Sequence, residues 1–387
     1  MPTIKAFKKM NKQKTRKKKI NFLFFNKYIT KLNILKGGKA TMYGSIGCIF
    51  SPAISCNKRE LTEYEKKNYI SKLMLPEEAE KEMRKVDLIS KKLSIIKQKE
   101  KFVKHLPILS TYMCDKPKIT ESDLENVKIC ENVKGFENIK QYNPEMFRHF
   151  KMLNMINSGE DLFEYKKKLN LNINKHSNDF LKKLTALVEC IFTLNNYGIF
   201  HCDLKIENIT YNTNEDCLSI IDFGRSLIVD DESKTVDILN DIAFDFNILP
   251  QILFFHSDLP LIDNEINMRE ILIKKINNSI NGELMLKELA SIFSVKEKKI
   301  IKVLSKILFT VYTNNELHEA KNLNNYFHEI FKWNLDIWSM FLVLNNLYSN
   351  TDHSKKVKSI TKNFFELSLV KRIDHAKIKD MFESLLI

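Results

Sequence analysis

The feature that most constrains this chain is a polar run near its middle. It reads His201-Cys202-Asp203-Leu204-Lys205-Ile206-Glu207-Asn208, and Asp222-Phe223-Gly224 begins fourteen residues after Asn208. The chain thus supplies a carboxylate, a lysine, an amide and a second carboxylate, in that order. A lone Asp-Phe-Gly is an ordinary turn, but both motifs at this spacing are specific. A surface loop beside a buried turn is the weaker interpretation.

These side chains suit the transfer of a phosphoryl group from metal-bound ATP. The reaction needs a carboxylate that accepts or orients the proton of the attacking hydroxyl, and cations and metal ligands that hold the phosphates in line. Asp203 is the predicted base, and Lys205, two residues on, is expected to reach the transferred phosphoryl group. Asn208 and Asp222 offer the hard oxygen ligands that Mg²⁺ prefers. ATP and Mg²⁺ are therefore the expected cofactors.

The two motifs resemble the H-R-D-L-x-x-x-N and D-F-G signatures of the protein kinases. The resemblance covers roughly residues 40–387. It implies an α+β, two-lobed protein-kinase-like fold, with a small β-rich N-lobe and a larger helical C-lobe. The expected organisation is a basic arm over 1–38, the N-lobe over 39–156 and the C-lobe over 157–387.

A candidate phosphate-binding loop lies near the start of the expected N-lobe. The run 42–49, Met-Tyr-Gly-Ser-Ile-Gly-Cys-Ile, resembles the kinase glycine-rich loop. Glycine lets the backbone of such a loop approach the nucleotide phosphates. The pattern is met at Gly44, Gly47 and Ile49, but Met42 replaces its first glycine, which lowers the backbone freedom at the loop entry.

The next strand and helix resemble the kinase elements that hold the α/β-phosphates. Lys72, in the predicted strand 68–74, is the expected phosphate-binding lysine, with an exposed edge-strand lysine as the alternative. A helix opening at Pro76 is expected to supply its glutamate partner. Glu82 fits best because apolar residues flank it at helical spacing, although it lies only ten residues from Lys72. The other candidates are Glu78 and Glu80.

The segment that joins the expected lobes begins near Met155. Residues 155–162 look like a kinase hinge, whose backbone near Met155 is expected to meet the adenine edge. An apolar stripe at helical spacing predicts a helix over 179–196, which Gly198 ends. The strand 199–200 then leads into the catalytic run.

Later resemblances are weaker. Asp336-Ile337-Trp338-Ser339 resembles the start of the kinase helix whose aspartate receives backbone N–H groups of the catalytic loop. If Gln251 and Arg372 replace a glutamate–arginine pair of the family, at best a hydrogen bond is expected between them. A loop proline at Pro250 and a surface arginine at Arg372 are an equally good interpretation. The 114 residues between Asp222 and Asp336 require an insertion at about 255–330, partly helical over 283–308.

Three functions are compatible with these residues. The favoured one is a serine/threonine-protein kinase that phosphorylates a protein hydroxyl, because the residue set is complete and Lys205 is the serine/threonine-type choice. A pseudokinase scaffold and a kinase-like small-molecule phosphotransferase are the alternatives. The loop run 44–52, the strand 70–74, the hinge 157–162 and the insertion together look like those of serine/threonine kinases of large nucleocytoplasmic DNA viruses. That resemblance implies an intracellular protein, in the cytoplasm of an infected cell, the virion or the nucleus.

Composition adds two expectations about compartment. The chain has seven scattered cysteines with neither a C-x-x-C pair nor zinc-like spacing, which favours reduced thiols in a reducing compartment. No apolar stretch of the sequence is as long as a membrane span. The most apolar candidate, residues 21–35, is interrupted by Lys27 and Lys31. We therefore expect no transmembrane segment.

Positive charge is concentrated at the N-terminus. Residues 1–40 contain twelve lysines, one arginine and no acidic residue, which leaves only +1 of the net charge of +14 for the rest of the chain. Such a block is expected to be disordered and self-repelling. A block of this kind can bind nucleic acid, an anionic membrane surface or an acidic partner, or it can act as a nuclear localisation signal. The alternative is a solvated tail.

Overall fold

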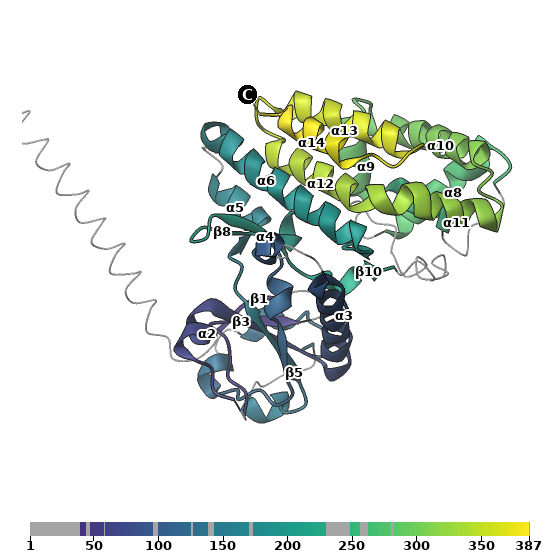
Figure 1. Cartoon of the computed structure of the whole chain (residues 1–387). Coiled ribbons are helices and arrows are strands. Elements are labelled where there is room, and N and C mark those ends of the chain that lie inside the picture. The colour runs from purple at the N-terminus through teal and green to yellow at the C-terminus, as the bar shows by residue number, and fades with distance from the viewer. Residues whose placement is uncertain are drawn as a thin grey trace, which may run out of the picture. The chain divides into compact units, whose positions relative to one another are not determined.

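The protein is α+β, with small antiparallel sheets in its N-terminal part and a helical C-terminal part (Figure 1). The computed structural model describes residues 39–43, 47–57, 59–95, 100–124, 127–137, 143–169, 173–229, 248–255, 262–279 and 282–386. The predicted arm and Gly44 lie outside these ranges. The chain divides into two compact units, which are described separately. One comprises the chain up to Ala79 with Met113–Asn154, and the other Glu80–Tyr112 with Met155–Ile387.

The first unit is built on a five-stranded sheet of order β1-β2-β3-β5-β4. Its strands are β1 (Lys39–Tyr43), β2 (Cys48–Ser51), β3 (Tyr69–Met74), β4 (Tyr112–Cys114) and β5 (Lys151–Ile156). The first residue of β4 and the last two of β5 fall in the second unit. The helix α2 (Glu63–Asn68) precedes β3, and three short 3₁₀ turns cover Glu121–Leu124, Val127–Cys130 and Pro144–Phe147. The strand predicted over 68–74 is thus confirmed as β3.

Sequence alternation explains how this sheet buries one face. In β2, Cys48 and Phe50 are buried while Ile49 and Ser51 are half-buried, as expected when successive side chains point to opposite faces. β1–β2 and β2–β3 pair antiparallel, and Ile49 lies opposite Lys72. Aromatic side chains complete this core, with ring centroids 5.0–5.7 Å apart: Phe136, Phe147 and Phe150.

Two disulfides cross-link the first unit, which overturns one prediction. Cys48 pairs with Cys130 and Cys56 with Cys114, with Cα atoms 5.7 and 5.9 Å apart. The expectation of seven reduced thiols is wrong, and the argument for a reducing compartment falls with it. The paired cysteines are 82 and 58 residues apart in the chain, so no local cysteine spacing predicted the two disulfides. They meet only because the sheet brings distant segments together.

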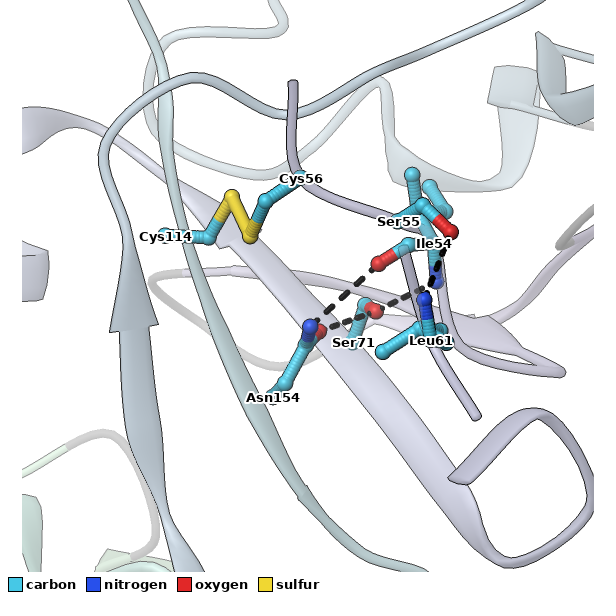
Figure 2. Close-up of a disulfide and its surroundings, with 7 residues drawn as sticks. All are labelled: Ile54, Ser55, Cys56, Leu61, Ser71, Cys114 and Asn154. Atoms are coloured by element: carbon cyan, nitrogen blue, oxygen red, sulfur yellow. Dashed lines mark hydrogen bonds between the residues drawn. A yellow bond between two sulfur atoms is a disulfide. The ribbon is translucent and has the colours of Figure 1, made fainter. Parts of the chain in front are cut away.

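The Cys56–Cys114 disulfide lies beside a buried polar network (Figure 2). Ser71 Oγ donates to Asn154 Oδ1 and accepts from the Ile54 N–H at 2.7 Å, and Asn154 Nδ2 donates to the Ile54 carbonyl at 3.3 Å. Buried polar groups are costly unless they are paired. The pairing therefore fixes the loop at Ile54 against β3 and β5.

The second unit is mainly helical. Its N-terminal helix is α3 (Pro76–Ser94), which begins at the predicted proline and whose first residues belong to the other unit. The other helices are α4 (Glu100–Val103), α5 (Leu162–Leu169), α6 (Ile173–Asn196), α8 (Glu265–Asn278), α9 (Gly282–Ile292), α10 (Glu297–Asn314), α11 (Ala320–Tyr326), α12 (Lys332–Tyr348), α13 (Ser354–Ser368) and α14 (His375–Glu383). The helix predicted over 179–196 ends as expected but begins six residues earlier.

Short strands in this unit carry the polar motifs. The three-stranded sheet has the order β6-β8-β9, and β7 pairs antiparallel with β10. Their bounds are β6 (Glu160–Asp161), β7 (Ile199–Phe200), β8 (Ile209–Asn212), β9 (Cys217–Ile220) and β10 (Leu227–Ile228). Short 3₁₀ turns follow at Ile206–Asn208, Phe223–Arg225 and Pro250–Phe255, and a π-helical turn at Phe327–Phe331 leads into α12.

The helices of the second unit enclose one apolar core. α12 packs against α6 and α13, and α14 packs against α6 (Figure 1). Residues predicted as an insertion form α8 to α11, and the helical character expected over 283–308 is confirmed by α9 and α10. Buried residues of these helices, such as Met268 and Leu304, belong to the same core cluster as Phe341 of α12. Among the described residues, no helix combines the length and apolarity that crossing a bilayer requires.

Candidate active site

The loop that carries the polar run is tied to a buried carboxylate of α12. Asp336 accepts hydrogen bonds from the backbone N–H groups of His201 (2.7 Å) and Cys202 (2.9 Å), which confirms the expected role of this aspartate. With its amide nitrogen turned toward the carboxylate, Asn195 donates to Asp336 as well, at 3.2 Å. Burial raises the pKa of Asp336, while His201 and the two N–H groups favour its charged form.

The next turn of this loop gathers three predicted residues. Lys205 Nζ lies 3.1 and 3.3 Å from the two carboxylate oxygens of Asp203. Asn208 Nδ2 donates to the backbone carbonyl of Asp203 at 2.8 Å and to its Oδ2 at 3.0 Å. Asp203 and Asn208 are buried, and Lys205 is half-buried. The carboxylate predicted as a base is thus fixed by a lysine and an amide.

The Asp-Phe-Gly turn is held against the same loop. The Ile221 N–H donates to the Asn208 carbonyl at 3.0 Å, and the His201 ring nitrogen Nε2 lies 2.9 Å from the Ile221 carbonyl. Phe223 is buried and meets the His201 ring edge-on at 4.7 Å. Asp222 itself is exposed, and its Oδ1 accepts from the Gly224 N–H at 3.3 Å. Asp222 therefore directly follows the residue whose backbone pairs with Asn208.

Two residues of this site have unusual backbone angles. Cys202 and Asp222 both have φ of 60°, in the left-handed region that side chains other than glycine rarely adopt. Such conformations persist where the surrounding structure enforces them, and they cluster at functional sites. Here Asp336 holds the Cys202 N–H, and the Gly224 N–H holds the Asp222 carboxylate.

A second group of predicted residues lies in the first unit. Lys72 is buried in β3, with Ile49 opposite it in β2. A Cβ at Gly47 would lie 2.9 Å from Lys72 Cγ, so the lysine stem packs directly on this glycine. The alternative of an exposed edge lysine is wrong, because Lys72 is only 7% exposed.

The remaining two predicted residues belong to the second unit. Met155 lies in β5 and is half-buried, and Glu82 lies on α3, also half-buried. Since Lys72 and Glu82 are in different units, their pairing stays a prediction. The same holds for a contact between Met155 and adenine.

The hydrogen bond expected between Gln251 and Arg372 is wrong. Gln251 is buried in the turn Pro250–Phe255. Arg372 instead lies over the Trp333 ring, 3.6 Å from its centroid, and donates to Asn196 Oδ1 at 3.3 Å. An aromatic face attracts a guanidinium when the two are this close. The arginine therefore has a partner that the sequence pattern did not indicate.

Two oxygen donors of this site are of the type that Mg²⁺ prefers. Because Asn208 Nδ2 donates twice to Asp203, the amide oxygen Oδ1 is left as the acceptor. Together with the Asp222 carboxylate it offers two hard ligands, and Mg²⁺ typically takes one or two protein ligands with water and phosphates. No cluster of three or more His, Cys, Asp or Glu ligands occurs in the described part of the chain. A Mg²⁺ ion held by Asn208 and Asp222 would take its other ligands from water and phosphates.

Two cations near the site escaped the sequence interpretation. Arg225 lies 3.7 Å from Asp203, and Lys85 of α3 donates to the carbonyls of Gly224 and Ser226. Arg225 directly follows the Asp-Phe-Gly motif, so its position was a usable signal. The sequence contained no comparable signal for Lys85, because it is one of many lysines in a predicted helix.

Comparison with known proteins adds no assignment. No protein-family model matches the chain, and no curated protein matches it.

Proposed function

We propose that the chain is a serine/threonine-protein kinase, with the two-lobed kinase fold, that transfers the γ-phosphate of ATP to a protein hydroxyl. The observation that carries the proposal is the arrangement around Asp203. Its carboxylate lies beside Lys205 and Asn208, on a loop whose N–H groups are bound by Asp336. This arrangement supports a positioned base next to a cation and a metal ligand.

Each residue has a separate task in this proposal. Asp203 accepts or orients the proton of the substrate hydroxyl, and the Lys205 ammonium stabilises negative charge on the transferred phosphoryl group. Asn208 and Asp222 hold Mg²⁺, which neutralises phosphate charge when it is bound. Lys72, whose side-chain stem packs on Gly47, contacts the α/β-phosphates. The residue types match phosphoryl transfer, in which positioning and electrostatics provide most of the catalysis.

The deciding experiment incubates the purified full chain with Mg²⁺ and γ-labelled ATP and a mixture of protein substrates. Label on serine or threonine, absent in an Asp203→Asn control, is the expected result. Nucleotide binding without transfer would favour the pseudokinase, and label confined to a small molecule would favour the other phosphotransferase. Label on tyrosine alone would contradict the serine/threonine assignment of Lys205.

Activity is expected to be independent of a phosphorylated loop that acts through the catalytic run. Cys202 occupies the position where the kinase pattern has arginine, and burial raises the pKa of its thiol well above the usual value. A neutral, buried thiol cannot pair with a phosphate as a guanidinium does. Phosphatase treatment should leave the phosphorylation rate nearly unchanged. If phosphatase treatment lowered the rate strongly, and did so equally in Cys202→Arg, the protein would have a phosphate-binding regulatory site elsewhere.

The arm of residues 1–38 is expected to be separable from catalysis. It carries most of the net charge, whereas the predicted nucleotide-binding residues begin at Gly44. Deleting it should leave the rate on a short peptide nearly unchanged and abolish salt-sensitive retention on nucleic acid or anionic lipid. Retention by the truncated chain would place the basic surface in the rest of the protein. A parallel loss of peptide phosphorylation would show that the arm contributes to the active fold.

A further inference from the structure

The segment that follows Asp222 has three backbone carbonyls bound by lysines of a single helix. Lys85 Nζ donates to the carbonyls of Gly224 and, at 3.1 Å, Ser226. Lys92 Nζ donates to the carbonyl of Val229 at 3.2 Å. Lys85 and Lys92 are seven residues apart on α3, so they lie on the same helix face. Figure 1 shows α3 beside β10, which lies between Ser226 and Val229.

The Lys85 ammonium is placed against these carbonyls despite a cost of burial. Removal of water lowers the pKa of Lys85, and the nearby Lys81 lowers it further, whereas Asp222 and Glu82 favour its charged form. A desolvated ammonium needs strong acceptors in exchange for water. The backbone carbonyls of Gly224 and Ser226 are these acceptors.

Gly224 links this lysine to the predicted metal ligand. Its carbonyl accepts from Lys85, and its N–H donates to Asp222 Oδ1 at 3.3 Å. Asp222 has a left-handed backbone, which its neighbours must enforce. Lys85 is thus connected through a single residue to the orientation of the Asp222 carboxylate.

The other side of the segment is fixed by the strand that enters the catalytic run. β10 pairs with β7, and the Val229 N–H donates to the Gly198 carbonyl at 2.7 Å. A side chain at position 198 would lie 2.2 Å from the Val229 carbonyl oxygen, so only glycine permits this approach. The segment from Gly224 to Val229 is therefore held between β7 and the lysines of α3.

We propose that Lys85, assisted by Lys92, is a positioning residue that holds the Asp-Phe-Gly turn so that Asp222 can bind the metal. The proposal rests on the kinase function inferred above. The catalytic run of this chain has Cys202 where the kinase pattern has arginine. Lys85 of α3 therefore orders the turn that this arginine cannot help to order here. The contact is made by a permanent side chain, so it needs no modification of the protein.

The test compares Lys85→Met and Lys85→Arg with Lys91→Met in the full chain. Methionine keeps the length of the stem but has no donor, arginine restores a cation, and Lys91 is an exposed lysine of the same helix. The first measurement is amide hydrogen exchange over residues 223–229. Lys85→Met should speed exchange there, while Lys91→Met should match the unmodified chain and Lys85→Arg should lie close to it.

The second measurement is the Mg²⁺ concentration that gives half-maximal phosphorylation. For Lys85→Met it should rise about tenfold, a loss comparable with those seen when partners that orient metal ligands are removed. The rate at saturating Mg²⁺ should fall much less. Unchanged exchange over 223–229 in Lys85→Met, or an equal rise in Mg²⁺ requirement for Lys91→Met, would overturn the proposal. Absence of activity in the unmodified chain would refute the kinase function, and the exchange measurement would still judge Lys85.

Discussion

Replacing Asp203 by asparagine is expected to lower the rate of phosphate transfer by about 10²–10⁴-fold, the usual contribution of a general base. The amide is close in shape to the carboxylate and keeps an oxygen that can accept from Lys205 or Asn208, but it cannot take the hydroxyl proton. Because Asp203 acts on the acceptor hydroxyl, the affinity for Mg²⁺-ATP should stay nearly unchanged. Single-turnover rates and nucleotide titration measure the two quantities separately.

Asp222→Asn is the matched comparison for this experiment. It also exchanges a carboxylate for an amide, but at the predicted metal ligand, so Mg²⁺-dependent nucleotide binding should fall together with the rate. Normal turnover in Asp203→Asn would refute the assignment of the base. Normal Mg²⁺ dependence in Asp222→Asn would refute the assignment of the metal ligand.

Asp336→Ala is expected to reduce both stability and activity. The change leaves the buried N–H groups of His201 and Cys202 without their acceptor. An unsatisfied buried donor costs about 1–3 kcal/mol, so the free energy of unfolding should fall by roughly 2–6 kcal/mol. The freed loop should also misplace Asp203, and a misplacement of about 1 Å lowers rates by on the order of 10²-fold. Denaturant unfolding and the transfer rate measure the two effects.

Asp374→Ala separates this effect from general loss of stability. Asp374 caps α14 by accepting from the Lys377 N–H at 2.7 Å, and losing such a cap costs about 1 kcal/mol. This variant should be less stable yet keep its rate at temperatures where it is folded. If Asp336→Ala kept both its unfolding midpoint and its rate, Asp336 would not anchor the loop.

Local features of the fold followed well from the sequence. The resemblance to the kinase elements predicted β3 within one residue of its observed start, and Pro76 marked the start of α3. Helical spacing of apolar residues predicted α6 and located its end at Asn196. These features depend on contacts between residues a few positions apart, which the order of residues records directly.

Part of the candidate site was also predictable. Asp203, Lys205 and Asn208 are five positions apart at most, so one loop turn was enough to bring them together. The contact of Asp336 with this loop spans more than 130 residues, and it was predicted only through a resemblance in the pattern after Asp336.

The sequence by itself determined which chemical groups are present, their order and the short elements that carry them. Only the tertiary structure decided which distant groups became partners. It paired Cys48 with Cys130 and Cys56 with Cys114, and it directed Arg372 to Trp333 instead of Gln251. It also placed Lys85 on the carbonyls of Gly224 and Ser226. Such pairings depend on how whole sheets and helices pack, and packing is fixed by burial over the entire core, so no local pattern encodes them.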